Sequence, residues 1–175
     1  TFNLFFKLKY AKTFDAILAT PLGPSDVAIG EVSWSLTRGL LYAIGFLLVM
    51  LALGLVLSPT AILAIPGALL IGLAAAAVGM AATTYMRKWQ DFDIVNVVTM
   101  PMFLFSGTFF PISVYPEWLQ VIVQLTPLYR GVHMLRAFTT GLIDPMVLVD
   151  IAYLTIMGLI GVAITSRRLK TLLLK

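Results

Sequence analysis

Long uncharged apolar stretches alternate with short polar ones along most of this chain. A helix needs about 20 mainly apolar residues to cross the roughly 30 Å hydrocarbon core of a bilayer. Four stretches approach or reach that length, and we predict four transmembrane helices at about 40–57, 61–82, 94–110 and 146–165. The third contains Pro101, and the fourth has Asp150 as its only charge. Small residues in the second permit close approach of a neighbouring helix: Gly72, Ala75, Ala76 and Gly79.

The composition favours a membrane protein over a soluble one. Hydrophobic residues make up 60% of the 175 residues and charged residues only 11%, whereas roughly a quarter of a soluble domain is charged. We therefore predict an all-α membrane protein in which residues 1–175 form one transmembrane domain. The sequence has no cysteine, which excludes disulfides, thiol chemistry and cysteine metal sites.

The distribution of basic residues predicts the orientation of the spans. Ten of the twelve Lys and Arg residues lie in the segments 1–39, 83–93 and 166–175, and the other two are Arg130 and Arg136. Because loops rich in Lys and Arg stay in the cytoplasm, we predict that both ends of the chain and the 83–93 loop are cytoplasmic. The net charge of +4 then reflects topology, and a nucleic-acid partner is not needed to explain it.

The segment 1–39 contains a short amphipathic helix ahead of the first full span. Asp15 lies opposite an apolar face of the segment 13–20, and Pro21 ends the helix. That apolar face is formed by Phe14, Ile17 and Leu18. Two interpretations are open, namely docking on a cytosolic partner and anchoring on the lipid surface.

The segment 111–145 does not cross the membrane. Its apolar stretch from Trp118 to Leu125 has only eight residues, which is too short for a span. Thr126 followed by Pro127 is typical of a helix start, and Gly141 is a fitting terminator. We predict an outer re-entrant hairpin of two short helices that dip into the membrane and return.

Three segments resemble the type-two ABC exporter permeases, which include antibiotic-resistance and nodulation-factor exporters. The most specific is Pro127-Leu128-Tyr129-Arg130 followed after five residues by Arg136. The others are Phe-Ser-Gly-Thr-Phe-Phe-Pro at 105–111, and Phe14-Asp15-Ala16-Ile17-Leu18-Ala19-Thr20-Pro21, which is similar to the family's coupling helix. The resemblance covers nearly the whole chain.

The resemblance implies the permease subunit of an ATP-driven exporter in a bacterial plasma membrane, moving a lipophilic, lipid-like or drug-like substrate. Such a subunit has six spans, pairs with a second permease subunit and binds cytosolic nucleotide-binding ATPase subunits, which hold ATP and Mg. Two spans are then missing before Phe2, and we expect the chain to be a fragment. The ATPase would dock on the coupling helix through Phe14, Asp15, Ile17, Leu18 and Pro21.

Several residues are candidates for a substrate pathway. Residues around Pro101 either line it or are lipid-facing filler: Met100, Met102, Phe103 and Phe105. Arg130 and Arg136 either attract an anionic substrate group, or anchor the hairpin at the membrane interface, or pair with Glu117 or Asp144.

Asp150 and His133 each have a structural and a functional interpretation. Asp150 is either a structural ion pair or a substrate gate, because a charge near mid-bilayer is retained only where it is paired or solvated. His133 is interpreted as facing lipid head groups rather than as a metal ligand or proton relay, because it is the only histidine.

Other functional classes have weaker support. An ion-coupled secondary transporter would carry charges near mid-membrane, but three of the four predicted spans carry none. An intramembrane enzyme would need a motif such as His-Glu-x-x-His or Gly-x-Ser-x-Gly, and the sequence has neither. A phosphate-binding glycine loop is also absent, so we expect no cofactor in this chain. A secondary transporter or a non-transport membrane protein remains the alternative.

Overall fold

The computed structural model describes residues 21, 24–86, 88 and 90–173. Every regular element in this part of the chain is helical, which confirms the all-α prediction. The elements are α3 (Pro24–Ala52), η1 (Pro59–Leu63), α4 (Ala64–Tyr85), α5 (Asp91–Leu104), η2 (Ile112–Val114), α6 (Glu117–Leu125), α7 (Pro127–Thr140) and α8 (Met146–Leu173). The predicted coupling-helix residues Phe14, Asp15, Ile17 and Leu18 lie outside the described residues, and Pro21 is exposed in a turn.

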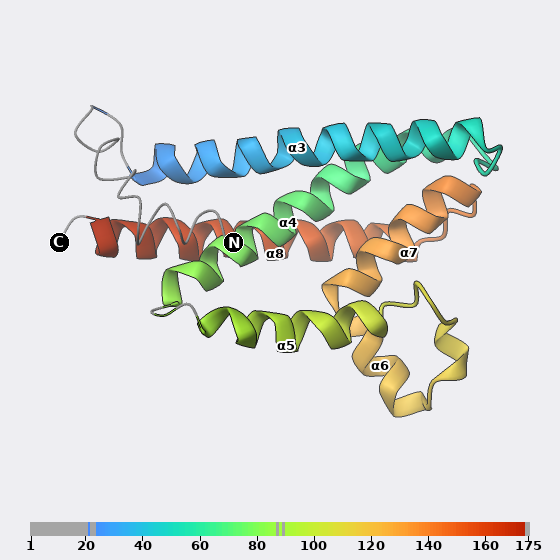
Figure 1. Ribbon diagram of the computed structural model, residues 1–175. Coiled ribbons are helices and arrows are strands. Elements are labelled where there is room, and N and C mark those ends of the chain that lie inside the picture. The colour runs from blue at the N-terminus through green and yellow to red at the C-terminus, as the bar shows by residue number, and fades with distance from the viewer. Residues whose placement is uncertain (1–20, 22–23, 87, 89, 174–175) are drawn as a thin grey trace.

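Three helices are long and apolar enough to cross a membrane: Ile29–Ala52, Pro59–Tyr85 and Met146–Arg168. In Figure 1 the start of α3, the α4–α5 link and the end of α8 lie at one end of the bundle. The loops after α3, after α5 and before α8 lie at the other end. This alternation is the one that the distribution of basic residues requires.

Two helices differ in extent from the predicted spans. The first helix starts at Pro24, well before residue 40, because charged residues end a membrane span without breaking a helix. The stretch 94–110 is helical only as far as Leu104, and α5 has 14 residues. At 1.5 Å per residue this helix is about 21 Å long, shorter than the hydrocarbon core.

The centre of the bundle is the contact between α4 and α8. Residues of α4, α7 and α8 form one buried hydrophobic cluster: Ala74, Met134, Ala137, Phe138, Val147 and Leu154. A Cβ atom on Gly161 would lie 2.7 Å from the backbone carbon of Ala77, so the two helix backbones approach closely there. The small residues that make this approach possible are therefore Ala77 and Gly161, whereas Ala75 is exposed.

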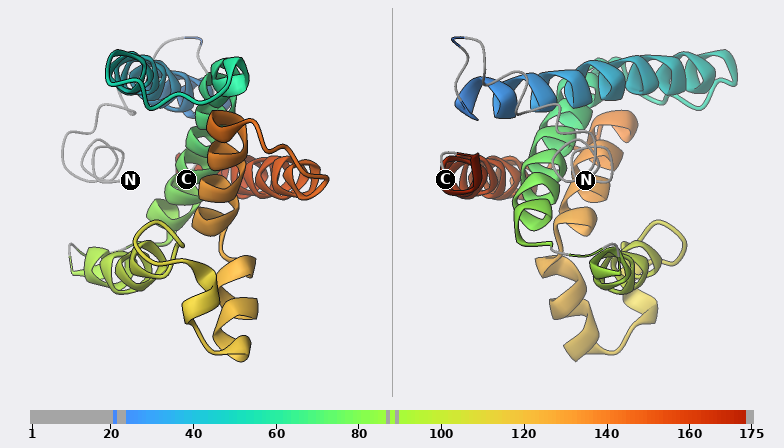
Figure 2. Two further views of the ribbon diagram at one scale, coloured as in Figure 1. Left: turned by 90° about the vertical axis from the view of Figure 1, so that its right-hand side faces the viewer. Right: turned by 60° about the vertical axis from the view of Figure 1, so that its left-hand side comes forward.

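The predicted helical hairpin is present as α6 and α7. Thr126 separates them: its hydroxyl donates to the Val123 carbonyl at 2.7 Å and accepts from the Tyr129 amide at 3.4 Å. Gly141 ends α7 in the left-handed conformation, with φ 81°, as the sequence predicted. Figure 1 shows the α6–α7 junction closer to the middle of the bundle than the outer ends of either helix. Beyond the junction, α7 packs between α4 and α8, and α6 projects away from them (Figure 2).

Candidate functional site

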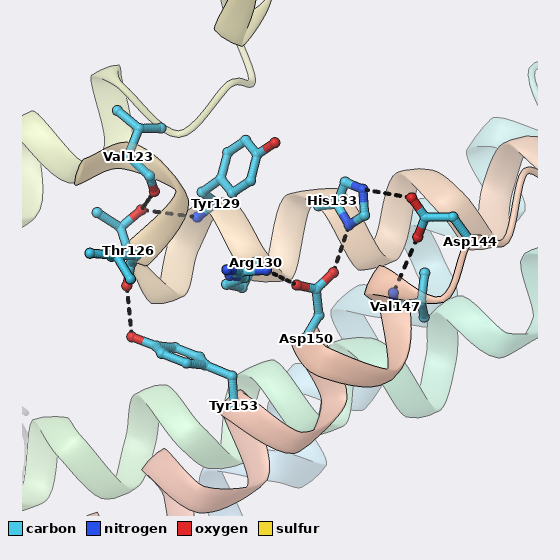
Figure 3. Close-up of polar contacts among 10 residues, drawn as sticks. Val123, Thr126, Tyr129, Arg130, His133, Asp144, Val147, Asp150 and Tyr153 are labelled. Carbon is cyan, nitrogen blue, oxygen red and sulfur yellow. Dashed lines mark hydrogen bonds and ion pairs between the residues drawn. The ribbon is translucent and has the colours of Figure 1, made fainter. Parts of the chain in front are cut away.

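The best-defined polar site joins the hairpin to the last long helix. Asp150, in the second turn of α8, has a fully buried side chain. Its Oδ1 atom accepts from Arg130 Nη1 at 3.1 Å, and its Oδ2 atom lies 2.6 Å from His133 Nδ1 (Figure 3). We call Arg130, His133 and Asp150 the hairpin anchor.

The helical repeat explains why two side chains of α7 reach one carboxylate. Residues three positions apart lie on the same face of a helix, so Arg130 and His133 both point from α7 toward α8. An ionised carboxylate only accepts hydrogen bonds, so Nδ1 of His133 is the donor to an ionised Asp150. Both carboxylate oxygens then have a donor, which is what a buried charge requires.

His133 also approaches a second carboxylate. Its Nε2 atom lies 3.8 Å from Asp144 Oδ2, and the Tyr129 ring stacks on the imidazole at 6.2 Å between centroids. Asp144 Oδ1 in turn accepts from the Val147 amide at 3.2 Å, at the start of α8. The interpretation of His133 as facing lipid head groups did not include its contact with Asp150, which lies on a different helix.

Tyr153 adds a contact that the sequence did not reveal. It follows Asp150 by three residues on the same face of α8, and its hydroxyl donates to the Leu125 carbonyl at 2.8 Å. That carbonyl belongs to the last residue of α6. One face of α8 therefore holds both helices of the hairpin, through Asp150 and Tyr153.

The remaining candidates do not join this site. Arg136 is exposed and donates from Nη2 to the Gly107 carbonyl at 3.1 Å. Neither arginine pairs with Glu117 or Asp144, which was one of the open interpretations. Around Pro101, Met100 and Phe103 are exposed, and Met102 and Phe105 are half-buried. Phe103 packs edge-on against Phe109, and Phe105 against Tyr115. Among the described residues, no cluster of three or more His, Asp or Glu side chains could hold a metal ion.

The family model and the individual proteins that this chain resembles agree with one another. Residues 3–139 match the model of the ABC-2 type transporter family. The chain is 27% identical over 172 residues to Nodulation protein J of Rhizobium meliloti, covering 94% of this chain and 65% of that protein. It is 28% identical over 170 residues to Nodulation protein J of Rhizobium leguminosarum bv. viciae, with 94% and 66% covered. The match to Nodulation protein J of Sinorhizobium fredii is 28% over 133 residues, 75% of this chain and 51% of that protein.

The chain thus spans about half to two thirds of the length of these relatives. No solved structure is significantly similar to it. The family match covers more than half of the chain and agrees with the three long apolar helices. On this evidence the chain belongs to the ABC-2 type transporter family, as a multi-pass membrane component rather than a catalytic subunit.

Proposed function

We propose that this chain is the carboxy-terminal part of a permease subunit that works with a cytosolic ATPase to export a lipophilic, lipid-like or drug-like substrate. The observation that carries the proposal is the family match over residues 3–139. It is supported by the helical hairpin before the last long helix, which carries the Pro127-Leu128-Tyr129-Arg130 segment.

A second permease subunit is part of the proposal. None of the 14 residues of α5 is buried in the described structure, and its exposed residues include Met100 and Phe103. A contiguous apolar surface of this kind needs lipid or another protein surface to cover it. We propose that α5, which includes Met102, faces the second permease subunit, as does Phe105 directly after it. The substrate pathway would then lie between the two subunits.

The orientation can be tested with cysteines, because the chain itself has none. In intact cells, Glu117→Cys should react with a membrane-impermeant maleimide, whereas Lys88→Cys and Lys170→Cys should react only after permeabilisation. The reason is that the α4–α5 link and the end of α8 lie at the opposite end of the bundle from α6. Labelling of Lys88→Cys from outside would reverse the orientation and remove the support for ATPase docking at residues 14–21.

The proposed function is tested most directly by removing the predicted ATPase contact. In the full-length permease, Phe14→Ala combined with Leu18→Ala should weaken co-purification of the ATPase and uncouple transport from ATP hydrolysis. Buried aromatic and aliphatic anchors carry most of an interface's energy, so the loss should be about 2 kcal/mol or more, roughly 30-fold in affinity.

The control for that test alters the other face of the same segment. Ala16→Ser combined with Ala19→Ser should leave ATPase recovery unchanged, because these positions lie away from Phe14 on the helix. If the Phe14 and Leu18 double variant also kept full ATPase recovery and transport, docking by this segment would be wrong and lipid anchoring would replace it.

A further inference from the structure

An apolar groove lies at the end of the bundle where α3 ends. It has a volume of about 300 Å³ and is lined by residues of α3, α4 and α7. The α3 wall runs from Ala43 to Met50, which is about 10 Å of helix. That length is about two thirds of the thickness of one leaflet's hydrocarbon layer, since the whole core is roughly 30 Å thick. The groove therefore has the length and direction of an acyl chain segment lying along a helix.

One charged residue stands at this groove. Among its twelve lining residues, Arg136 alone is charged, and Thr108 and Thr139 are the polar residues beside it. Arg136 lies one turn before the end of α7, on the α7 wall of the groove between Val132 and Thr139. A single cation on the wall of an otherwise apolar groove suits an amphiphile with an anionic head.

The charge of Arg136 is not compensated by a carboxylate within the described residues. Its side chain donates one hydrogen bond, from Nη2 to the Gly107 carbonyl. A guanidinium has five N–H donors in a fixed fork that suits phosphate oxygens. Arg130, by contrast, is committed to Asp150 at 3.1 Å, so the two arginines of α7 have different roles.

We propose that this groove binds one acyl chain of an anionic membrane phospholipid, with the phosphate on Arg136. The bound phospholipid is proposed in addition to the transported substrate, and the proposal does not depend on the proposed export activity. A bound lipid would fill the space between the α3 and α7 walls, and so would link the hairpin to the first long helix. A single Arg near a bilayer surface is worth about 1 kcal/mol toward anionic lipid, roughly a fivefold preference.

The test measures lipid retention by the full-length permease. The protein is equilibrated in mixed micelles with equal amounts of phosphatidylglycerol and phosphatidylethanolamine, and bound lipid is counted by native mass spectrometry. We expect the wild type to keep one phospholipid with about a fivefold preference for phosphatidylglycerol. Arg136→Gln should abolish the preference, and Ala68→Leu, which fills the groove, should abolish retention.

The matched control removes a positive charge at the other end of the bundle. Lys88→Gln should keep both the bound lipid and the preference, because Lys88 lies in the α4–α5 link. An equal preference in wild type and Arg136→Gln would overturn the proposal. So would a wild type that retains no lipid, which is the result expected if another protein segment fills the groove. Arg136 is exposed, so Arg136→Gln remains informative even if Ala68→Leu impairs folding.

Discussion

Asp150→Leu should strongly destabilise the full-length permease. The substitution leaves the Arg130 side chain, only 12% exposed, without its partner. Removing one member of a buried ion pair typically costs about 3–5 kcal/mol, because the remaining charge stays buried and unpaired. The measurement is the melting temperature in detergent, followed by size-exclusion chromatography of heated samples.

Two further variants separate the ion pair from general damage. Asp144→Asn should change the melting temperature little, because Asp144 has a side chain 53% exposed and asparagine can still accept from the Val147 amide. Arg130→Met combined with Asp150→Leu should recover part of the loss, since both charges are removed together. It also removes the Arg130 Nε atom, which is buried with no hydrogen-bond partner in the described structure. Equal melting temperatures for Asp150→Leu and Asp144→Asn would contradict the structural role of the pair.

Gly161→Ala should also destabilise the permease, by less than Asp150→Leu. The added Cβ atom would meet the Ala77 backbone carbon at 2.7 Å and the Val78 nitrogen at 2.9 Å. Backbone atoms cannot rotate away as a flexible side chain can, so α4 and α8 must separate. Overpacking of this kind costs about 1–3 kcal/mol, and we expect Gly161→Leu to prevent assembly of the two helices.

Neighbouring glycines provide the controls for this prediction. Gly158 lies three residues earlier in α8, where a Cβ atom would be 3.5 Å from Ala74, an ordinary contact. A Cβ atom on Gly45 in α3 would have no described residue within 4 Å outside its own helix turn, so Gly45→Ala should be neutral or stabilise by up to about 1 kcal/mol through helix propensity. The same melting-temperature assay applies to all three alanine variants. A Gly161→Ala protein as stable as Gly158→Ala would mean that the two helices do not approach this closely.

Much of the architecture could be predicted from local sequence. The lengths of the apolar stretches identify α3, α4 and α8, and Thr126-Pro127 and Gly141 mark both ends of α7. These features depend on residues close together in the chain. The extent of α5 was harder to predict, because residues 105–110 carry no charge and so continue the uncharged stretch beyond the helix end. There the Ser106 hydroxyl donates to the Phe103 carbonyl at 2.8 Å, and Gly107 takes a positive φ of 76°, which turns the chain.

The polar site depends on contacts that no local pattern contains. The sequence indicated that Asp150 needs a partner, and a structural ion pair was one of the two interpretations. Its partners, Arg130 and His133, lie 20 and 17 positions earlier on a different helix. The pattern of α7 alone does not contain the pairing of His133, because its acidic partner lies on another helix. The spacing of Arg130 and His133 on one face was the available signal.

The isolation of α5 from the other described helices has a consequence for sequence variation. Because α5 buries no residue and packs closely against no other described helix, substitutions there leave the interior of the bundle intact. Selection on its side chains would then act through whatever covers them outside this chain. Positions in α4 and α8 are instead constrained by packing. Sequence divergence among homologues at α5 would therefore reflect a change of partner or transported substrate. Divergence at the α4–α8 contact would reflect compensating changes in side-chain volume.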